Sequence, residues 1–285
     1  LRRNGASLLA TLHDWCCHND STLMDAALRN TSLEAALRCS AAWCTAGLIS
    51  PTAYAEGTIL TSRACQCLAA TPATNEALAE LAAEALNAAL AASLVGGSID
   101  CDSVLLLCTY ARTIHDGLAS HALTRHIASV VCTACMVLAH QLLSFGSSSA
   151  DALSVAAAVA SELNKWVALL VQSVVTLPLS DAGGARGCWI ELHDLCNETP
   201  FDDKASTAGS AQATLDALLA PFRAGVLNGI LCGGGALPSN FEVLSLEDRA
   251  AVEEAREDCR ALLRGTIFVR EEATHAAIDA LRQHA

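Results

Sequence analysis

Long stretches of this chain contain neither glycine nor proline, and this limits what the chain can fold into. The sequence has 6 prolines in 285 residues, and alanine and leucine dominate it. Alanine favours helix because it loses no side-chain entropy there, whereas proline disrupts helix interiors. Only 4% of the residues are aromatic, and no strand pattern is evident. The sequence therefore predicts an all-α protein.

Apolar residues recur at helical spacing in segments that short polar or glycine-containing turns separate. A cap at 30–32 is expected to divide two helices, and Pro221 to kink or restart another. Ser245 with Asp248 resembles a capping box. The chain from 102 to 145 is expected to be almost continuously helical, with a break near Gly117 or Ser120. The other expected helices are 5–18, 22–29, 32–46, 58–69, 75–94, 150–176, 181–196, 209–231, 242–264 and 270–284.

Helix–loop–helix units of about 40 residues have the size of HEAT-type repeats. Several segments are apolar around much of their circumference, as helices are when they stack on both sides in a solenoid. We therefore expect an α-solenoid of HEAT-like antiparallel helix pairs, forming a single array over 1–285 with possible sub-blocks 1–145 and 150–285. A compact helical bundle is the alternative.

The net charge of −13 disfavours nucleic acid as a partner, because binding there depends on neutralising phosphates. An acidic chain suits a soluble protein with basic partners. The most apolar run, 127–143, contains His140 and Gln141 and is short for a bilayer span. We expect neither direct nucleic-acid binding nor membrane insertion.

The 14 cysteines fall at irregular spacings, nearly all within helical patterns. We expect reduced thiols that pack as small hydrophobic groups, in a nuclear or cytosolic protein. Cys132 and Cys135 form a CxxC pair inside an apolar helical run, where core packing is favoured over redox or metal chemistry. The run Cys16–Cys17–His18 has no second cluster at finger-like spacing, so packing is favoured there also.

Three histidines, His115, His121 and His126, lie near Asp116 and could serve acid–base or metal chemistry. Their spacing fits no metalloprotease pattern, so a solvated or partly buried set is the favoured interpretation. The glycine runs 183–187 and 233–235 follow no strand and lack the ending of a phosphate-binding loop, so they are interpreted as inter-helical turns. We expect no catalytic residue, metal or cofactor, and hence no enzyme.

Acidic residues are concentrated near the C-terminal end of the chain. A charge run is usually a solvated helix face, and that is the alternative here. The functional interpretation is an acidic surface for a basic partner. Its residues are Glu242, Glu247, Asp248, Glu253, Glu254, Glu257 and Asp258, interrupted by Arg249 and Arg256.

The run from Leu37 to Trp43 followed by Gly47–Leu48–Ile49 resembles a segment of the nuclear transport receptors in the importin-13 and transportin-SR branch of the β-karyopherins. Segments at 60–70, 75–86, 109–112, 188–192 and 246–269 are similar to later parts of the family and run in the same order. The resemblance implies an internal segment of a longer HEAT-repeat receptor. In it, Trp43 would fill space between stacked repeats and Gly47 would end a helix.

The resemblance further implies a receptor that shuttles between nucleus and cytoplasm and binds protein cargo, under regulation by GTP-bound Ran. Ran would contact the full-length receptor, through N-terminal repeats outside this segment, and nucleoporins are further possible partners. Two alternatives remain: a helical scaffold or adaptor subunit unrelated to transport, and an all-α enzyme or metal-binding protein. The latter would use the 115–126 or 132–135 region.

Overall fold

The computed structural model describes most of the chain between residues 26 and 269. The described residues are 26–47, 58–70, 76–92, 100–145, 150–177, 181–198, 211–235, 241–269, 274–275, 277–279 and 282. Within these ranges every regular element is a helix. The chain divides into two compact units, Leu1–Val137 and Leu138–Ala285.

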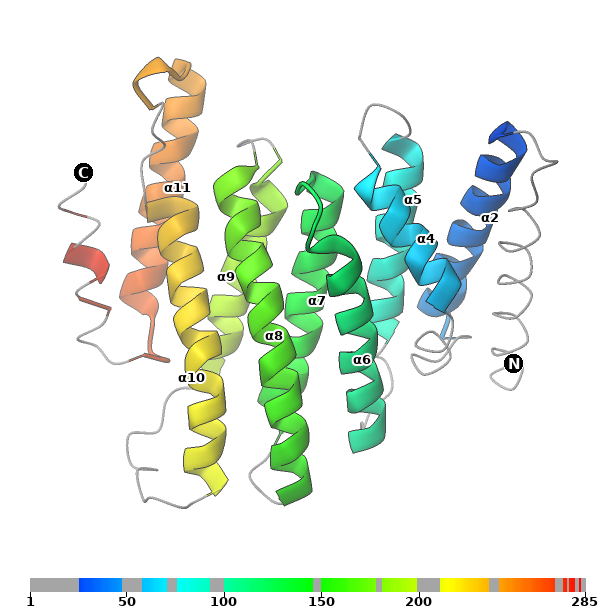
Figure 1. Cartoon of the computed structure of the whole chain (residues 1–285). Helices are drawn as coiled ribbons and strands as arrows, with labels where there is room; N and C mark the ends of the chain where they lie inside the picture. The colour runs from blue at the N-terminus through cyan, green and yellow to red at the C-terminus, as the bar shows by residue number, and fades with distance from the viewer. Residues whose placement is uncertain are drawn as a thin grey trace. The chain divides into compact units, whose positions relative to one another are not determined.

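The first unit contains helices that pack around leucine, isoleucine and alanine side chains. They are α2 (Ala26–Thr45), α4 (Thr58–Ala69), α5 (Glu76–Ala91), α6 (Cys101–Leu118) and the first part of α7 (Arg125–Ser144). α5 packs against α2 and α4, and α4 also packs against α6 (Figure 1). The α4–α6 contact passes over one helix in the chain order, as contacts do in stacked helical repeats.

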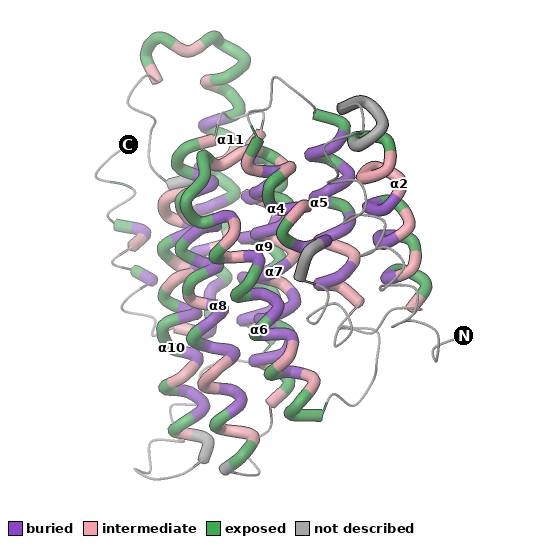
Figure 2. Tube along the Cα trace, turned by 45° about the vertical axis from the view of Figure 1, so that its right-hand side comes forward, coloured by how far each residue is buried: buried purple, intermediate pink, exposed green. Residues whose placement is uncertain are grey.

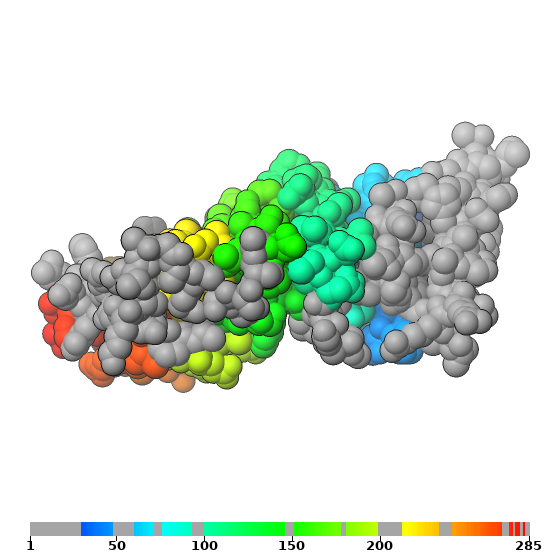
Figure 3. Space-filling view, turned by 90° about the horizontal axis from the view of Figure 1, so that it is seen from below, coloured from blue at the N-terminus to red at the C-terminus, as the bar shows by residue number. Residues whose placement is uncertain are grey.

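The second unit also consists of packed helices. They are α8 (Ala150–Thr176), α9 (Gly183–Glu198), α10 (Ala211–Ile230) and α11 (Leu246–Gly265), with a π-helical turn η4 (Leu231–Gly235) and a 3-10 turn η5 (Phe241–Val243). α10 packs against α8, α9 and α11, and η4 adds contacts with α8 and α11. In Figure 2 the buried stretches of α8 and α10 alternate with exposed ones along each helix. Figure 3 shows α11, in orange, beside α9, in yellow-green.

Close approach of α10 to its neighbours depends on a glycine stripe at Gly225, Gly229 and Gly233. A Cβ on Gly225 would stand 2.6 Å from Cγ1 of Val167, and one on Gly229 would stand 2.3 Å from Cζ2 of Trp189. A side chain at either position would therefore collide with α8 or α9. Only glycine fits at these two positions, because neighbouring side chains occupy the space that a Cβ would need.

The prediction of an all-α, solenoid-like fold is confirmed for the described residues, within each unit. Helices expected at 58–69 and 150–176 have these bounds in α4 and α8. The expected break in 102–145 is also present, since α6 ends at Leu118 and α7 begins at Arg125. α10 continues through Pro221 without ending.

Two sequence predictions about helix boundaries are wrong. The cap expected at 30–32 does not form, because α2 runs without interruption from Ala26 to Thr45. Asparagine, threonine and serine lower helix stability by only tenths of a kcal/mol each, so they do not end a helix that packing supports. The glycine run 183–187 is not a turn between helices, because it forms the start of α9, whereas 233–235 belongs to the turn η4 between α10 and α11.

Several expectations fall outside the described residues. They concern the helix at 5–18, most of 22–29, the Cys16–Cys17–His18 cluster and the residues 146–149 between the two possible sub-blocks. The final expected helix, 270–284, is described only at scattered positions.

A candidate partner-binding surface on α11

Helix α11 begins at a side-chain cap. The backbone N–H of Asp248 donates to Ser245 Oγ at 3.1 Å, and the Ser245 hydroxyl donates to Asp248 Oδ2 at 2.7 Å. An aspartate replaces the usual glutamate of a capping box, and Glu247 and Asp248 lie near the positive end of the helix dipole. The Ser245–Asp248 prediction is confirmed, and the cap fixes where the acidic helix starts.

Only a narrow stripe of α11 faces the rest of its unit. Val252, Arg256, Cys259 and Leu263 are buried at helical spacing, and no residue from Leu246 to Ala251 is buried. All the acidic residues singled out from the sequence are exposed: Glu242, Glu247, Asp248, Glu253, Glu254, Glu257 and Asp258. Six of them lie on α11 and Glu242 lies in the preceding turn η5, and this set of exposed carboxylates is named here the acidic surface.

The arginines of this helix do little to neutralise the acidic surface. Arg249 turns back onto η5, where Nε donates to the Leu244 carbonyl at 3.2 Å and the guanidinium lies 5.8 Å from the centre of the Phe241 ring. Arg260 pairs with Glu257, and Arg256 is buried. Of the α11 arginines only Arg264 is fully exposed. The exposed charge is thus strongly negative over the described part of this helix.

Two large apolar side chains stand at the start of the same surface. Val243 is 82% exposed and Leu246 is 85% exposed. Both are next to acidic residues in the chain, Glu242 and Glu247. Exposed apolar groups within a charged rim are a feature of protein-binding surfaces.

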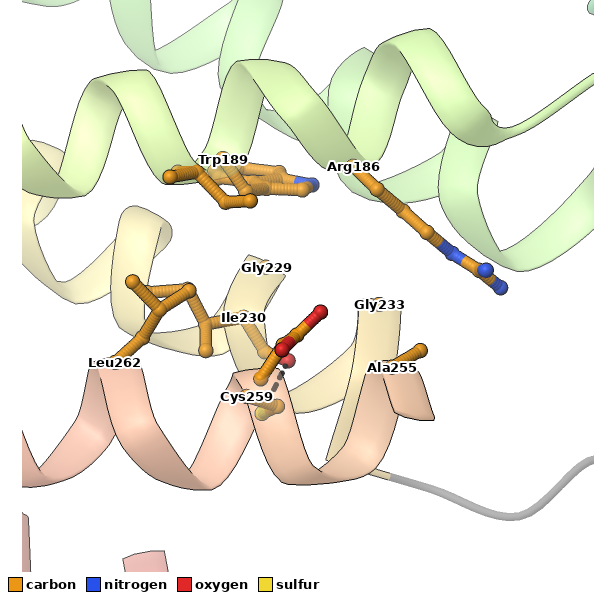
Figure 4. Close-up of a pocket in the computed structure, with 10 residues that line it drawn as sticks. Arg186, Trp189, Gly229, Ile230, Gly233, Ala255, Cys259 and Leu262 are labelled. Carbon is orange, nitrogen blue, oxygen red and sulfur yellow. Dashed lines mark hydrogen bonds between the residues drawn. The ribbon is translucent and has the colours of Figure 1, made fainter. Parts of the chain in front are cut away.

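A small pocket adjoins the acidic surface, between α9, the α10–η4 segment and α11 (Figure 4). Its volume is about 70 Å³. Trp189 and Ile190 come from α9, Gly229, Ile230 and Gly233 from α10 and η4, and Ala255, Cys259 and Leu262 from α11, with Arg186 and Asp258 as the charged lining residues. Sequence reasoning missed this pocket, although the acidic set already contained Asp258.

One wall of the pocket is fixed by an unusual hydrogen bond. Cys259 Sγ donates to the Ile230 carbonyl at 3.0 Å, a contact drawn in Figure 4. Burial raises the pKa of the Cys259 thiol to about 12, so it stays protonated and able to donate. The bond joins α11 to the end of α10.

The far end of α11 is held by a second set of contacts, named here the clasp. His193 Nε2 lies 3.1 Å from Thr266 Oγ1, and its Nδ1 lies 3.1 Å from Asp194 Oδ1. Asn197 Nδ2 donates to the Gly265 carbonyl, and the Ile267 N–H donates back to Asn197 Oδ1, both at 3.2 Å. The clasp therefore anchors the C-terminal end of α11 to α9.

The histidines considered for acid–base chemistry do not meet. His115 Nδ1 lies 3.4 Å from its neighbour Asp116, whereas His126 Nε2 lies 3.5 Å from Glu76, which also pairs with Arg125. His121 lines a separate hollow of about 430 Å³ between α4 and α6. Across the residues that the structure describes, no three histidine, cysteine or acidic side chains are grouped to hold a metal.

The CxxC cysteines lie within α7 and are not joined in a disulfide. Cys135 is fully buried, and desolvation raises the pKa of its thiol well above the ordinary value. A buried thiol with a raised pKa is a poor nucleophile and a poor redox centre. Burial has the same effect on the pKa of Cys44, which rises to about 12.

The segment that carries the family resemblance ends α2. Gly47 has a φ of +65°, and its N–H donates to the Cys44 carbonyl at 2.9 Å. This left-handed conformation is typical of glycine just after a helix. Trp43 is half-buried on the last turn of α2.

Three helical segments are long and apolar enough to cross a membrane, judged by length and composition alone: Arg125–Ser144, Asp151–Thr176 and Ala213–Gly233. The expectation that 127–143 is too short for such a span is wrong in length, because this run lies within α7, which is 20 residues long. In each segment, between 44% and 61% of the most apolar stretch of 18 residues is buried inside the protein. Two of the segments also bury charged side chains, Glu162 in α8 and Arg223 in α10.

Comparisons with protein-family models, with curated proteins and with solved structures found no match for this chain. The identification of the candidate site therefore rests on the charges and contacts of α9, α10 and α11.

Proposed function

We propose that this chain is a non-catalytic helical scaffold that binds a basic segment of a partner protein on the acidic surface of α11. The observation that carries the proposal is the charge imbalance of that surface. Seven carboxylates are exposed between Glu242 and Asp258, while the arginines of this stretch are half-buried or buried. Complementary charge of this kind steers a basic partner and speeds its association.

The way α11 is held also supports a binding role. Its start is fixed by the Ser245 cap and its end by the clasp. The buried stripe between them is narrow, so most of the circumference of α11 stays available to a partner. A surface that is ordered before binding loses less conformational entropy when the partner arrives.

Within this class we propose a segment of a nuclear transport receptor that shuttles between nucleus and cytoplasm. The resemblance of the run from Leu37 to Ile49 to the β-karyopherins supports this proposal. In each unit, moreover, a helix packs against the second helix that follows it in the chain, as in stacked helical repeats. In this proposal the acidic surface binds protein cargo. GTP-bound Ran and nucleoporins contact other repeats of the full-length receptor. An adaptor subunit unrelated to transport would use the same surface without Ran.

A peptide-binding experiment tests the acidic surface. A short amidated peptide of lysine and arginine is titrated into the full chain, with a glutamate-rich peptide of equal length as the negative probe. Glu253→Gln with Glu254→Gln removes two surface charges, and we expect about tenfold weaker binding of the basic peptide. Rising salt should weaken the wild-type interaction and reduce this difference.

The matched control removes two charges elsewhere. Glu80 and Glu84 are both exposed on α5, so Glu80→Gln with Glu84→Gln changes the net charge equally and should leave binding unchanged. Equal losses in both double variants would mean that only net charge matters, which contradicts a defined site. For the transport role, the amount of cargo bound by the full-length protein should differ between Ran loaded with GTP and Ran loaded with GDP. Equal amounts with the GTP and GDP forms would contradict transport and favour the adaptor.

A further inference from the structure

The pocket beside the acidic surface contains polar groups that the fold leaves unsatisfied. Trp189 is 2% exposed, and its indole Nε1 has no hydrogen-bond partner among the residues that the structure describes. The same holds for Nε of Arg186, one helical turn earlier. Buried N–H groups without acceptors are rare in folded proteins, because each loses its hydration without compensation.

These two groups lie at the pocket rather than deep in the core. Both Trp189 and Arg186 line it, and in Figure 4 the nitrogen-bearing edge of the indole points toward the Arg186 side. Burial also lowers the pKa of the Arg186 guanidinium from its ordinary value. Each of the two nitrogens is closed off from solvent, so a hydrogen-bond acceptor in the pocket would meet them after the flexible Arg186 side chain turns.

The rest of the lining suits a small aliphatic group. Ile190, Ile230 and Leu262 provide branched side chains, and Ala255 contributes only a methyl group to the lining. The volume of about 70 Å³ is roughly half that of a cavity that accepts benzene. It therefore admits a group the size of a leucine or valine side chain and excludes a large aromatic ring.

The pocket opens where the acidic surface passes. Asp258 belongs to both, because it is exposed on α11 and also lines the pocket. Glu254 and Glu257 are exposed on the neighbouring turn. A basic segment that follows α11 would thus bring its own side chains past the pocket mouth.

We propose that this pocket receives one aliphatic side chain of the basic partner segment, while a backbone carbonyl of that segment accepts hydrogen bonds from Trp189 Nε1 and Arg186 Nε. This inference rests on the proposed function, because it assigns the anchoring position of the same partner. Charge complementarity selects the segment, and the pocket sets its register. The pocket is already formed, since Gly229 supports the indole and the Cys259–Ile230 hydrogen bond fixes the opposite wall.

Two amidated peptides test the anchor. Both consist of lysine and arginine around one central residue, which is leucine in one peptide and alanine in the other. The leucine peptide should bind the full chain about tenfold more tightly, as burial of a few methyl and methylene groups requires. In protein labelled with ¹⁵N at tryptophan, its binding should also move the indole N–H signal of Trp189, assigned with Trp189→Phe.

Filling the pocket should abolish the preference. Ala255 lines the pocket, whereas Ala261 is exposed elsewhere on α11. Ala255→Phe should lower the affinity for the leucine peptide to that for the alanine peptide. Ala261→Phe should leave the preference for the leucine peptide intact. Circular dichroism of both variants verifies that the helix content of the protein is retained.

The outcomes separate the two proposals. Equal binding of the leucine and alanine peptides, with no movement of the Trp189 signal, overturns the anchor and leaves the acidic surface in place. If neither peptide binds, the acidic surface is overturned. The pocket is then judged with N-methylisovaleramide, which carries an isobutyl group and one amide carbonyl. A Trp189 shift with this compound that Ala255→Phe removes supports the pocket, and its absence overturns it.

Discussion

Gly229 lies directly against the indole ring of Trp189, so close that a Cβ on the glycine would stand 2.3 Å from the ring. The two residues belong to different helices, α10 and α9, and the Trp189 side chain is buried. The indole is rigid, so it cannot move aside as the end of a flexible chain would. The contact therefore sets how closely α9 and α10 approach.

Replacement of Gly229 by alanine should lower the free energy of unfolding by about 1–3 kcal/mol, the usual cost of overpacking a core. Gly187→Ala is the matched control, because Gly187 lies in α9 and a Cβ there would meet no atom within 4 Å. It should stabilise the protein by about 0.5–1 kcal/mol through helix propensity. Urea denaturation followed by circular dichroism measures both. Similar midpoints for the two variants would contradict the contact.

Thr266→Val should destabilise the second unit. The Thr266 hydroxyl donates to the Leu262 carbonyl at 3.0 Å and is the partner of buried His193 Nε2. Valine keeps the shape but leaves the imidazole unsatisfied, at a cost of about 1–3 kcal/mol.

The control for the clasp is Thr176→Val on α8. Thr176 makes the same bond to a carbonyl four residues earlier, at 2.8 Å, but it is exposed. Its replacement should change the unfolding free energy by less than about 0.5 kcal/mol. Thermal unfolding of the two variants, run in parallel, compares them. Equal changes in stability would show that the His193–Thr266 contact adds no stability beyond the hydrogen bond that each threonine makes within its own helix.

Asp100 should make helix α6 sensitive to acid. Its carboxylate accepts hydrogen bonds from the backbone N–H and the hydroxyl of Ser103, at 2.8 and 2.9 Å, and these lower its pKa. Because the folded-state pKa lies below the unfolded one, the stabilisation is present above the ordinary aspartate pKa. It is lost as pH falls through the folded value, below about pH 4.

Asp100→Asn isolates this titration, because asparagine caps a helix but does not ionise. The stability of the wild type should fall more steeply in acid than that of Asp100→Asn, as followed by urea denaturation over a pH series. Parallel curves for the two proteins would refute the assignment.

Thiol alkylation should divide the cysteines by burial. Cys44 and Cys196 are buried, and desolvation raises the pKa of each thiol to about 12. Near pH 8 only about one such thiol in ten thousand is ionised, so iodoacetamide should not label them in the native protein. Cys101 is exposed and should react within minutes. Mass spectrometry after brief labelling measures this, and urea should make all of them reactive.

Local sequence patterns were sufficient to place many helices and one cap. The α8 bounds follow from apolar spacing and flanking breaks, and the Ser245 cap from residues three positions apart. The cap expected at 30–32 failed because packing of α2 outweighs the weak preference of polar residues for helix ends. Propensity is a local property, whereas helix continuity depends on the whole unit.

The candidate site was only partly predictable for a related reason. The carboxylates from Glu242 to Asp258 lie close together in the chain, so their common exposure can be inferred from composition. The Trp189–Gly229 contact and the His193–Thr266 bond join positions far apart in the sequence. Nothing local marks such partners, although a glycine inside a helical pattern, as at Gly229, can indicate close approach.

The uneven anchoring of α11 has a consequence for how this helix opens. Its first buried side chain is Val252, while its last turn is held by Leu263 and the clasp. Opening is therefore easiest at the Ser245 end and hardest at Gly265. Amide hydrogens should exchange with solvent in a gradient along the helix, fastest in the first turns. A partner bound across the acidic surface would flatten that gradient, so hydrogen exchange would report occupancy residue by residue.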